Sequence, residues 1–342
     1  MRRIFAVLAV GFALLLSGCG AGGPDAKYQI AVVPKSVSFE FWTRVEAGAK
    51  AAATEMDSTA VRWKGTSDES DVAGQVRILE SFINQGVDAI VVAATDSKGI
   101  VPTLREAEKQ GIPVITIDSG TEPQISRSLI STNNARAAGK AADLIAGATG
   151  GEGQVALIPY VAGASTSNAR EKGFKRHLQQ YEGLKLVTTR YSNSSYSRAM
   201  TVTEDILTSY PNLDAIFAAN EPSAVGTAQA LKSRGKAGEV TLVGFDASPR
   251  EIEGMRSGTI HGLIVQNPYR MGYHGVKQAM RAIKGKPVEK RIDSGSIVVT
   301  NENLDQFLAR RKQRKSGKSP APADTGRARS DTSRGRSAAT GE

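Results

Sequence analysis

Short apolar runs alternate with longer amphipathic stretches along most of this 342-residue chain, and no other sequence feature constrains the fold as strongly. Each run is nearly continuous, which is typical of strands that are buried on both faces of a parallel sheet. The predicted strands are Ile30–Val33, Ala89–Ala93, Pro113–Ile117, Gln154–Ile158, Ala215–Ala218, Val240–Val243 and Leu263–Val265.

The stretches between these runs predict amphipathic helices, several of which end at a glycine in the helix-stop position, as at Gly86 and Gly111. The alternation of strand and helix predicts a doubly wound α/β architecture. Because the pattern recurs on both sides of about residue 132, we expect two similar domains instead of one wide sheet. The predicted helices include Trp42–Met56, Val72–Gln85, Ile100–Gln110, Ala135–Ala146, Asn168–Gln180 and Arg198–Ser209.

The N-terminus has the pattern of a bacterial lipoprotein signal. Arg2 and Arg3 precede an uncharged apolar run from Ile4 to Leu16, and the only cysteine, Cys19, follows after two small residues. The run is shorter than the roughly twenty residues that span a bilayer. We therefore expect a signal at 1–19, a lipid on Cys19, a tether at 20–26 and an envelope protein held on the extracytoplasmic side of a membrane. The alternative is an ordinary signal peptide with an incidental cysteine.

The formal net charge of +10 is concentrated at the two ends of the chain. Residues 310–342 contain ten Lys or Arg and three Asp or Glu, so the body between the signal and this tail is nearly neutral. The charge therefore gives no reason to expect nucleic acid as a partner. The tail has no large apolar residue and is predicted to be disordered, either without a specific role or in contact with anionic lipid or cell-wall polymer.

Polar side chains gather just after the predicted strands, where ligands of open parallel sheets bind. Amides and carboxylates hydrogen-bond to hydroxyls, and aromatic faces pack on apolar C–H surfaces. The combination predicts a carbohydrate or polyol site, although an enzyme cleft has a similar composition. The candidate residues are Lys35, Phe41, Trp42, Asp118, Arg170, Tyr196, Asn220, Asp246 and Gln266.

Several candidates also have a purely structural interpretation. Phe41 and Trp42 are then core residues at the start of a helix. Asp118, Asn220 and Asp246 are then N-caps, because Asp and Asn are preferred at that position.

Catalytic chemistry has little support in the sequence. His177, His261 and His274 are the only histidines and lack metal-ligand spacing, and no Gly-x-Ser-x-Gly elbow occurs. With Cys19 as the only cysteine, no thiol is left for a disulfide, a metal site or a nucleophile. We expect no enzymatic activity, no cofactor and no metal. A sugar-responsive repressor needs a helix-turn-helix where the export signal stands.

From about Tyr28 to Leu304 the sequence resembles the periplasmic sugar-binding proteins of the ribose-binding type, the substrate-capturing subunits of ABC importers. Each matching segment alone is weak, but the set in this order is specific for the family. The segments are Pro113–Asp118, Gly163–Phe174, Asp214–Asn220, Val243–Asp246 and Ile264–Gln266.

The resemblance implies a type I periplasmic binding protein fold, in which two domains are joined by a hinge of three chain crossings near 132–133, 266–267 and 293–296. The implied domains are 27–132 plus 267–293 and 133–266 plus 294–309. The implied function is that a monomer captures a monosaccharide or related polyol between its closing domains and delivers it to a membrane permease. The implied hydrogen-bonding residues are Asp118, Arg170, Asn220, Asp246 and Gln266, and the implied ring-stacking residues are Phe41, Trp42 and Tyr196.

Three positions depart from the ribose binders. Phe39 and Ala93 stand where that family carries asparagine, and Ser119 stands where it carries arginine. Loss of three polar side chains from a hydrogen-bonding site predicts a changed specificity, away from ribose.

The first domain is also similar to autoinducer-2-binding relatives, in which the lysine matching Lys35 contacts the ligand. Arg170 and Asn220 depart from that pattern, so the second domain resembles the sugar binders more than it resembles the autoinducer-2-binding proteins. Two cations facing one cleft favour a ligand with a carboxylate or many oxygens. The alternative function is therefore a sensor for autoinducer-2 or a sugar acid. The similar segments are Ile30–Lys35, Gly74–Val76, Phe82–Gly86 and Asp118–Ser119.

Overall fold

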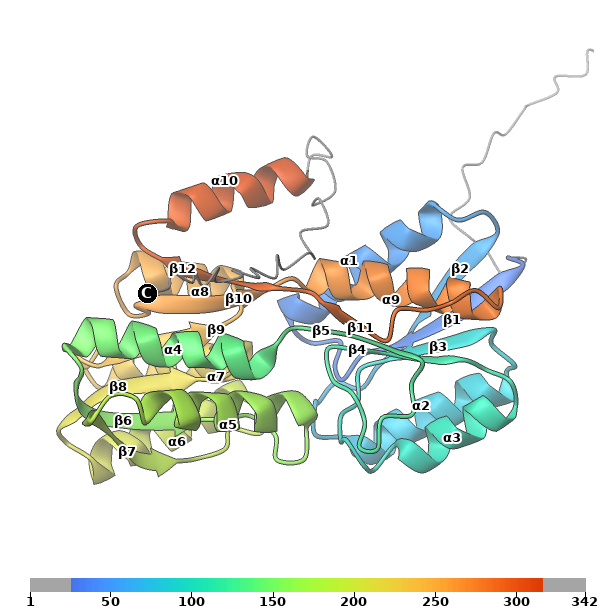
Figure 1. Ribbon diagram of the computed structural model, residues 1–342. Coiled ribbons are helices and arrows are strands. Elements are labelled where there is room, and N and C mark those ends of the chain that lie inside the picture. The colour runs from blue at the N-terminus through green and yellow to red at the C-terminus, as the bar shows by residue number, and fades with distance from the viewer. Residues whose placement is uncertain (1–25, 316–342) are drawn as a thin grey trace, which may run out of the picture. The chain divides into compact units, whose positions relative to one another are not determined.

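The protein was analysed as a computed structural model that describes residues 26–315 (Figure 1). The chain divides after Asn301 into two units. The first unit contains two six-stranded sheets, and the second contributes helix α10 (Leu304–Lys315) to the described residues. No helix among residues 26–315 combines the length and the apolarity needed to span a membrane.

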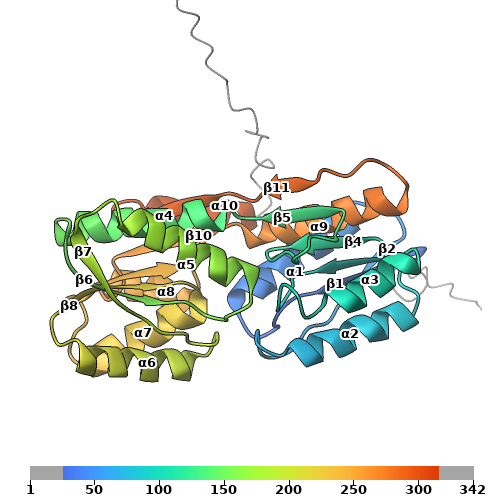
Figure 2. The same ribbon diagram turned by 60° about the horizontal axis from the view of Figure 1, so that its bottom comes forward.

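The first sheet is parallel throughout, and its strand order is β11-β5-β4-β3-β1-β2. Side chains alternate between its two faces. Ile30 and Val32 pack with helices α1 and α9, whereas Ala31 and Val33 pack with α2 and α3. Figures 1 and 2 show these helix pairs on opposite faces of the sheet. The elements are β1 (Tyr28–Val33), β2 (Thr59–Trp63), β3 (Ala89–Val92), β4 (Val114–Ile117), β5 (Ser128–Ser131), β11 (Arg291–Asp293), α1 (Glu40–Thr54), α2 (Val72–Asn84), α3 (Val101–Lys109) and α9 (Pro268–Ile283).

The second sheet has the order β12-β10-β9-β8-β6-β7 and is parallel except for β12, which runs antiparallel to β10. Helices α4 and α5 cover one face, and α6, α7 and α8 cover the other (Figure 2). The elements are β6 (Glu152–Ile158), β7 (Gly183–Thr189), β8 (Leu213–Ala218), β9 (Thr241–Phe245), β10 (Gly262–Gln266), β12 (Ser296–Thr300), α4 (Asn134–Thr149), α5 (Ser165–Leu178), α6 (Tyr196–Ser209), α7 (Glu221–Ser233) and α8 (Pro249–Arg256).

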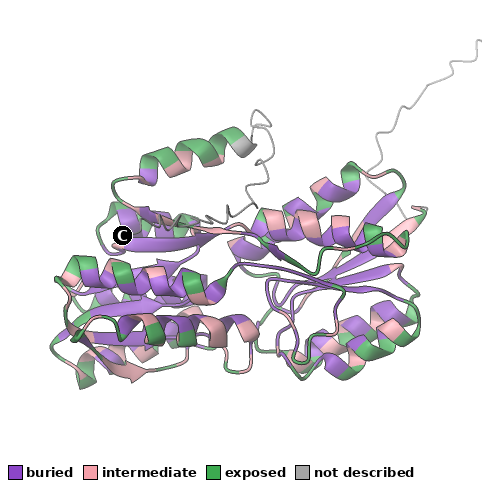
Figure 3. Cartoon of the chain, viewed as in Figure 1, coloured by how far each residue is buried: buried purple, intermediate pink, exposed green. Residues whose placement is uncertain are grey.

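Burial follows this layering. The central strands of both sheets are buried along nearly their whole length, and the helices are exposed on their outer faces (Figure 3). Helices α1 and α9 approach each other closely at glycines. A Cβ at Gly272 would overlap the carbonyl oxygen of Val45, and one at Gly48 would overlap that of Tyr269. These glycines therefore set the separation of the two helices.

The chain crosses between the sheets three times, after β5, after β10 and between β11 and β12. At the last crossing Thr132 Oγ1 and Ser294 Oγ lie 3.0 Å apart, which ties two of the crossing segments together. The predicted fold class, two doubly wound parallel-sheet lobes with three connections, is confirmed. We call the half built on the first sheet the first lobe and the half built on the second sheet the second lobe.

The ends of the chain differ from the predicted boundaries. Helix α10 continues to Lys315, so residues 310–315 of the predicted disordered tail are helical. The first unit ends at Asn301, which separates residues 302–309 from the second lobe to which they were assigned. The predicted signal at 1–19, the lipidation site Cys19, residues 20–25 of the tether and the tail from residue 316 lie outside the described residues.

Candidate functional site

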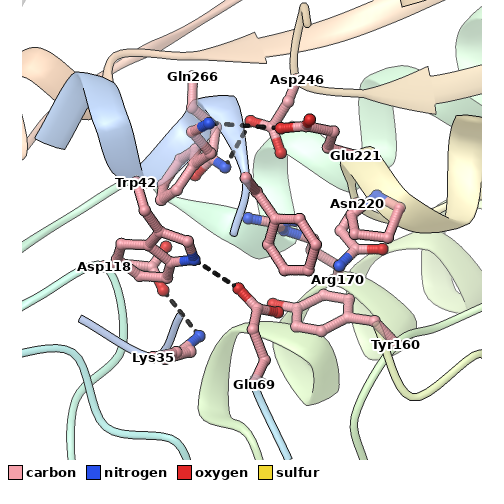
Figure 4. Close-up of a pocket in the computed structure, with 13 residues that line it drawn as sticks. Lys35, Trp42, Glu69, Asp118, Tyr160, Arg170, Asn220, Glu221, Asp246 and Gln266 are labelled. Atoms are coloured by element: carbon pink, nitrogen blue, oxygen red, sulfur yellow. Dashed lines mark hydrogen bonds and ion pairs between the residues drawn. The ribbon is translucent and has the colours of Figure 1, made fainter. Parts of the chain in front are cut away.

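A pocket lies between the two lobes (Figure 4). Its lining comes mainly from residues that follow the carboxyl ends of strands, the edge at which parallel sheets bind ligands. Eight of the nine predicted ligand-binding residues line it. The lining residues are Lys35, Phe39, Phe41, Trp42, Glu69, Asp118, Tyr160, Arg170, Asn220, Glu221, Pro222, Asp246 and Gln266.

Lys35 and Asp118 form a buried ion pair with 2.7 Å between Lys35 Nζ and Asp118 Oδ2. Lys35 Nζ also donates to Thr166 Oγ1 of the second lobe at 3.1 Å, and Ser119 Oγ donates to Asp118 Oδ2 at 3.0 Å. Burial opposes the charge of Lys35, but the negative charge of Asp118, supported by Glu69, outweighs burial and raises the pKa of the lysine. The positive charge of Lys35 is therefore already paired with a carboxylate of the protein.

The two aspartates occupy equivalent places in the two lobes. Asp118 follows β4 and Asp246 follows β9, and both have a left-handed backbone, with φ of 54° and 91°. Each backbone N–H donates to the neighbouring strand, to Ile130 O at 2.8 Å and to Ile264 O at 2.9 Å. Residues other than glycine seldom adopt positive φ, and such strain concentrates at functional sites.

Arg170 projects from α5 and is 2% exposed. Its Nε donates to Asn134 Oδ1 at 2.8 Å, and one terminal nitrogen donates to the carbonyl of Ala219 at 2.7 Å. The guanidinium also lies 3.6 Å from the centroid of the Phe245 ring, a cation–π distance. Three partners therefore hold this side chain in place at the pocket wall.

Asn220 is both a cap and a pocket residue. Its Oδ1 accepts from the N–H of Ser223 at 3.1 Å, which caps α7, while its Nδ2 donates to Ser194 Oγ at 2.8 Å. Asp246 caps no helix, since Ser248 is the N-cap of α8. Asp118 likewise precedes no described helix directly. Of the three residues interpreted as caps, only Asn220 is one, and this role coexists there with a place in the pocket. Phe41 and Trp42 are buried core residues at the start of α1, as their structural interpretation predicted, and they line the pocket as well.

The aromatic residues are positioned by polar partners. Trp42 Nε1 donates to Glu69 Oε1 at 2.8 Å, and the Phe41 ring stands nearly perpendicular to the Trp42 ring, at 87° and 4.9 Å between centroids. Tyr196 does not line the pocket, contrary to the prediction. It contacts two lining residues: its ring packs edge-on against Phe39, and its hydroxyl donates to Glu221 Oε1 at 3.2 Å.

Three polar lining residues were absent from the sequence-based candidate set. Glu221 and Tyr160 follow strands β8 and β6 closely, so the rule that points to strand ends also points to them. Glu69 lies in the loop between β2 and α2, and its neighbourhood contains no apolar run that would have drawn attention to it. It is 7% exposed and accepts from Trp42 and from Ser194 Oγ, the latter at 2.5 Å.

Burial and mutual repulsion raise the pKa of three carboxyl groups. Burial raises the pKa of Glu221 to about 7, with a further contribution from the charge of Asp246. Burial likewise raises the pKa of Asp246 to about 6, although Arg170 and Gln266 oppose the shift. Glu251, fully buried behind them, has a pKa well above its ordinary value for the same reason. This part of the site holds protons more tightly than free carboxyl groups do.

The sequence-based hypothesis of a ligand with a carboxylate or many oxygens loses part of its basis in this geometry. It rested on Lys35 and Arg170 as two cations facing one cleft, yet Lys35 is paired with Asp118. The pocket contains four carboxyl groups, including Glu69 and Glu221, which the sequence argument did not take into account.

Several hydrogen bonds join the two lobes around the pocket. Besides Lys35–Thr166 and Glu69–Ser194, Ser119 Oγ lies 3.0 Å from Thr166 Oγ1, and the backbone N–H of Phe41 donates to Glu221 Oε2 at 3.3 Å. The N–H of Ser97 also donates to the carbonyl of Gly163 at 3.2 Å. The lobes thus meet through the same residues, or their neighbours, that line the pocket.

Comparison with known proteins fits this architecture. The family described as the periplasmic binding protein domain matches residues 30–287. The chain belongs to this family. The D-ribose/D-allose-binding protein of Pseudomonas aeruginosa is 30% identical over 302 residues, which cover 85% of this chain and 94% of the relative.

Two solved structures extend the comparison. A carbohydrate transporter solute-binding protein from Agrobacterium radiobacter, in complex with D-arabinose, is 32% identical with a TM-score of 0.80, covering 84% of this chain and 98% of that one. An ABC transporter solute-binding protein from Agrobacterium vitis, with bound D-fucose, is 36% identical with a TM-score of 0.79, covering 82% and 98%. The resemblance to ribose-type binding proteins is confirmed, whereas the similarity to autoinducer-2-binding proteins is not.

Proposed function

We propose that this protein is the extracytoplasmic substrate-binding lipoprotein of an ABC importer, which captures a monosaccharide or related polyol and delivers it to a membrane permease. The observation that carries the proposal is the pocket itself, which combines three aromatic side chains of the first lobe with hydrogen-bonding groups from both lobes. Family membership and the named ligands of the relatives support it.

The binding mechanism follows from where the lining residues originate. Phe41, Trp42 and Asp118 belong to the first lobe, and Arg170, Asn220, Asp246 and Gln266 to the second. A ligand that contacts both groups stabilises the arrangement in which the lobes touch, and the three crossings act as the hinge. The moving bodies are 27–132 with 267–293 and 133–266 with 294–301. Binding needs no bond-making step, so the protein acts as a monomeric carrier without catalytic activity or cofactor.

Calorimetric titration of the purified protein with pentoses, hexoses, polyols and sugar acids tests the proposal. We expect micromolar or tighter binding of at least one neutral sugar, polyol or close derivative. Asp246→Asn should weaken it by at least tenfold, because this change removes the charge but keeps the shape. A matched control is Glu253→Gln on the exposed face of α8. Failure of every sugar and polyol derivative to bind would reject the proposal.

Membrane attachment through Cys19 is a separate part of the proposal, supported by the sequence pattern alone. Metabolic labelling with a radioactive fatty acid should mark the protein in bacterial cells, and Cys19→Ser should abolish the label while leaving sugar binding unaltered. A label that persists in Cys19→Ser would exclude lipidation at this residue.

A further inference from the structure

The charges of the pocket do not balance. Its lining contains two cationic side chains, Lys35 and Arg170, and four carboxyl groups. One cation is already matched, because Lys35 is paired with Asp118 at 2.7 Å. Arg170 therefore faces the remaining three carboxyl groups alone, and these are Glu69, Glu221 and Asp246.

The excess of negative charge is concentrated at one end of the pocket. Figure 4 shows Glu221 and Asp246 beside each other, away from the Lys35–Asp118 pair. Among residues 26–315 neither carboxyl group forms an ion pair within 4.0 Å. Their hydrogen-bond donors are neutral: Glu221 accepts from the N–H of Phe41 and the hydroxyl of Tyr196, and Asp246 Oδ1 accepts from Gln266 Nε2 at 2.9 Å.

An unpaired acceptor marks the same end. Gln266 lines the pocket and is 7% exposed, its amide nitrogen is used on Asp246, and its buried Oε1 has no hydrogen-bond partner. A buried acceptor without a donor is destabilising, because it has lost its hydrogen bonds to water. Arg170 does not donate to this oxygen: its two hydrogen bonds within the site go to Asn134 and Ala219. This end therefore offers an open amide oxygen beside two carboxylates, and it requires hydrogen-bond donors.

We propose that the ligand carries a protonated amine, as an amino sugar or an amino polyol does, and that the ammonium group binds between Glu221, Asp246 and the Oε1 of Gln266. An ammonium group has three donors, no acceptor and a positive charge. It satisfies the free amide oxygen and both carboxylates together. A hydroxyl group has one donor and no charge, so it leaves the negative charge of the carboxylates unbalanced. A sugar acid would add a further negative charge. The inference rests on the proposed function and specifies its substrate class.

The raised pKa values of Glu221 and Asp246 agree with this geometry. Both groups bind protons more tightly than free carboxyl groups do, because no nearby cation fully offsets their burial and the repulsion from other carboxylates. An ammonium group between them favours their ionised forms, because an opposite charge within about 4–6 Å lowers the pKa of a carboxyl group.

Matched pairs of ligands test the inference. The full-length protein in detergent is titrated with D-glucose and D-glucosamine, D-galactose and D-galactosamine, D-mannose and D-mannosamine, and D-glucitol and 1-amino-1-deoxy-D-glucitol, at a pH where the amines are protonated. We expect the amine of at least one pair to bind at least tenfold more tightly than its hydroxyl twin, or about 1.4 kcal/mol. If neutral members bind and no amine exceeds its twin, the inference is wrong and the proposed function stands. If no member binds while another sugar or polyol of the calorimetric panel does, the inference is wrong and the proposed function stands. If nothing in either panel binds, both are wrong.

Variants locate the ammonium site. Glu221→Gln removes the charge, keeps an acceptor oxygen for Phe41 N–H and places an amide N–H2 that can donate to the Tyr196 hydroxyl oxygen. It should lower the ratio of amine to hydroxyl affinity about tenfold. Asp246→Asn should lower the same ratio. Glu253→Gln, an equal charge change on the exposed face of α8, should leave it unaltered. An unchanged ratio in both pocket variants, with thermal midpoints that show folded protein, would overturn the assignment.

Discussion

Glu221 is a buried carboxyl group whose protonation should control the stability of the ligand-free protein. Its pKa rises from an ordinary value of 4.5 to about 7. The folded state therefore binds this proton more tightly than the unfolded state, so stability is highest below about pH 4.5 and falls as the pH rises toward about 7. The full shift corresponds to about 3 kcal/mol, at 1.36 kcal/mol per pKa unit.

Glu221→Gln removes this dependence, since glutamine does not titrate. Between about pH 5 and pH 8 the wild-type protein should lose roughly 2–3 kcal/mol relative to the variant. For a chain of this size that loss is a relative fall of roughly 5 °C in the thermal midpoint. Asp246 and Glu251 continue to titrate in both proteins, so the difference between the two profiles isolates Glu221 and its coupling to them.

Differential scanning calorimetry of both proteins, without ligand and at several pH values, measures this difference. The control is Glu253→Gln, the same substitution on the exposed face of α8. Parallel profiles for Glu221→Gln and the wild type would refute the reasoning. They would show that water or rearrangement solvates the Glu221 carboxylate after ionisation.

Further predictions concern contacts outside the carboxylate cluster. Lys35→Met should lower stability by about 3–5 kcal/mol, because it leaves the buried carboxylate of Asp118 without its cation, and adding Asp118→Asn should restore most of the thermal midpoint. Gly272→Ala should cost about 1–3 kcal/mol by forcing α9 away from α1, whereas Gly147→Ala, with open space around the new Cβ, should be neutral or stabilising in the same assay. Ser194→Ala should weaken sugar binding roughly tenfold in calorimetry, because it removes the hydrogen bond to Glu69 between the lobes and the acceptor of Asn220 Nδ2, although Ser194 itself does not line the pocket; an unchanged affinity would show that these bonds do not contribute to binding.

The limits of the sequence-based fold prediction follow from sheet position. All seven predicted strands are present, and each is an interior strand with a continuous apolar run. Four of the five strands that were not predicted, β2, β7, β11 and β12, form the edges of the two sheets. An edge strand is partly solvated and therefore has no continuous apolar run. The fifth, β5, is buried but begins and ends with serines, whose hydroxyls bond to Glu289 O and Asp118 O.

The same rule explains which site residues were found. Asp118, Asp246 and Gln266 come directly from the ends of predicted interior strands, and all three line the pocket. Glu69 was missed because it follows β2, an edge strand without an apolar signature. Tyr196 was assigned to the pocket because a resemblance gives the type and order of residues. It does not show which of two aromatic rings in contact, Phe39 or Tyr196, lines the pocket. Here Phe39, at a position where ribose binders carry asparagine, lines the pocket.

One hydrogen-bonded chain connects recognition to lobe contact. Trp42 donates to Glu69, which also accepts from Ser194 of the second lobe, and Ser194 in turn accepts from Asn220. Trp42, Glu69 and Asn220 line the pocket, while Ser194 lies just outside it. A ligand that orders the Trp42 ring or the Asn220 amide therefore also orders the partners of the bond between the lobes. The contacts to the ligand and the contacts between the lobes share side chains, so ligand binding and lobe contact should be energetically coupled. Ser194 should therefore influence ligand affinity although it does not line the pocket.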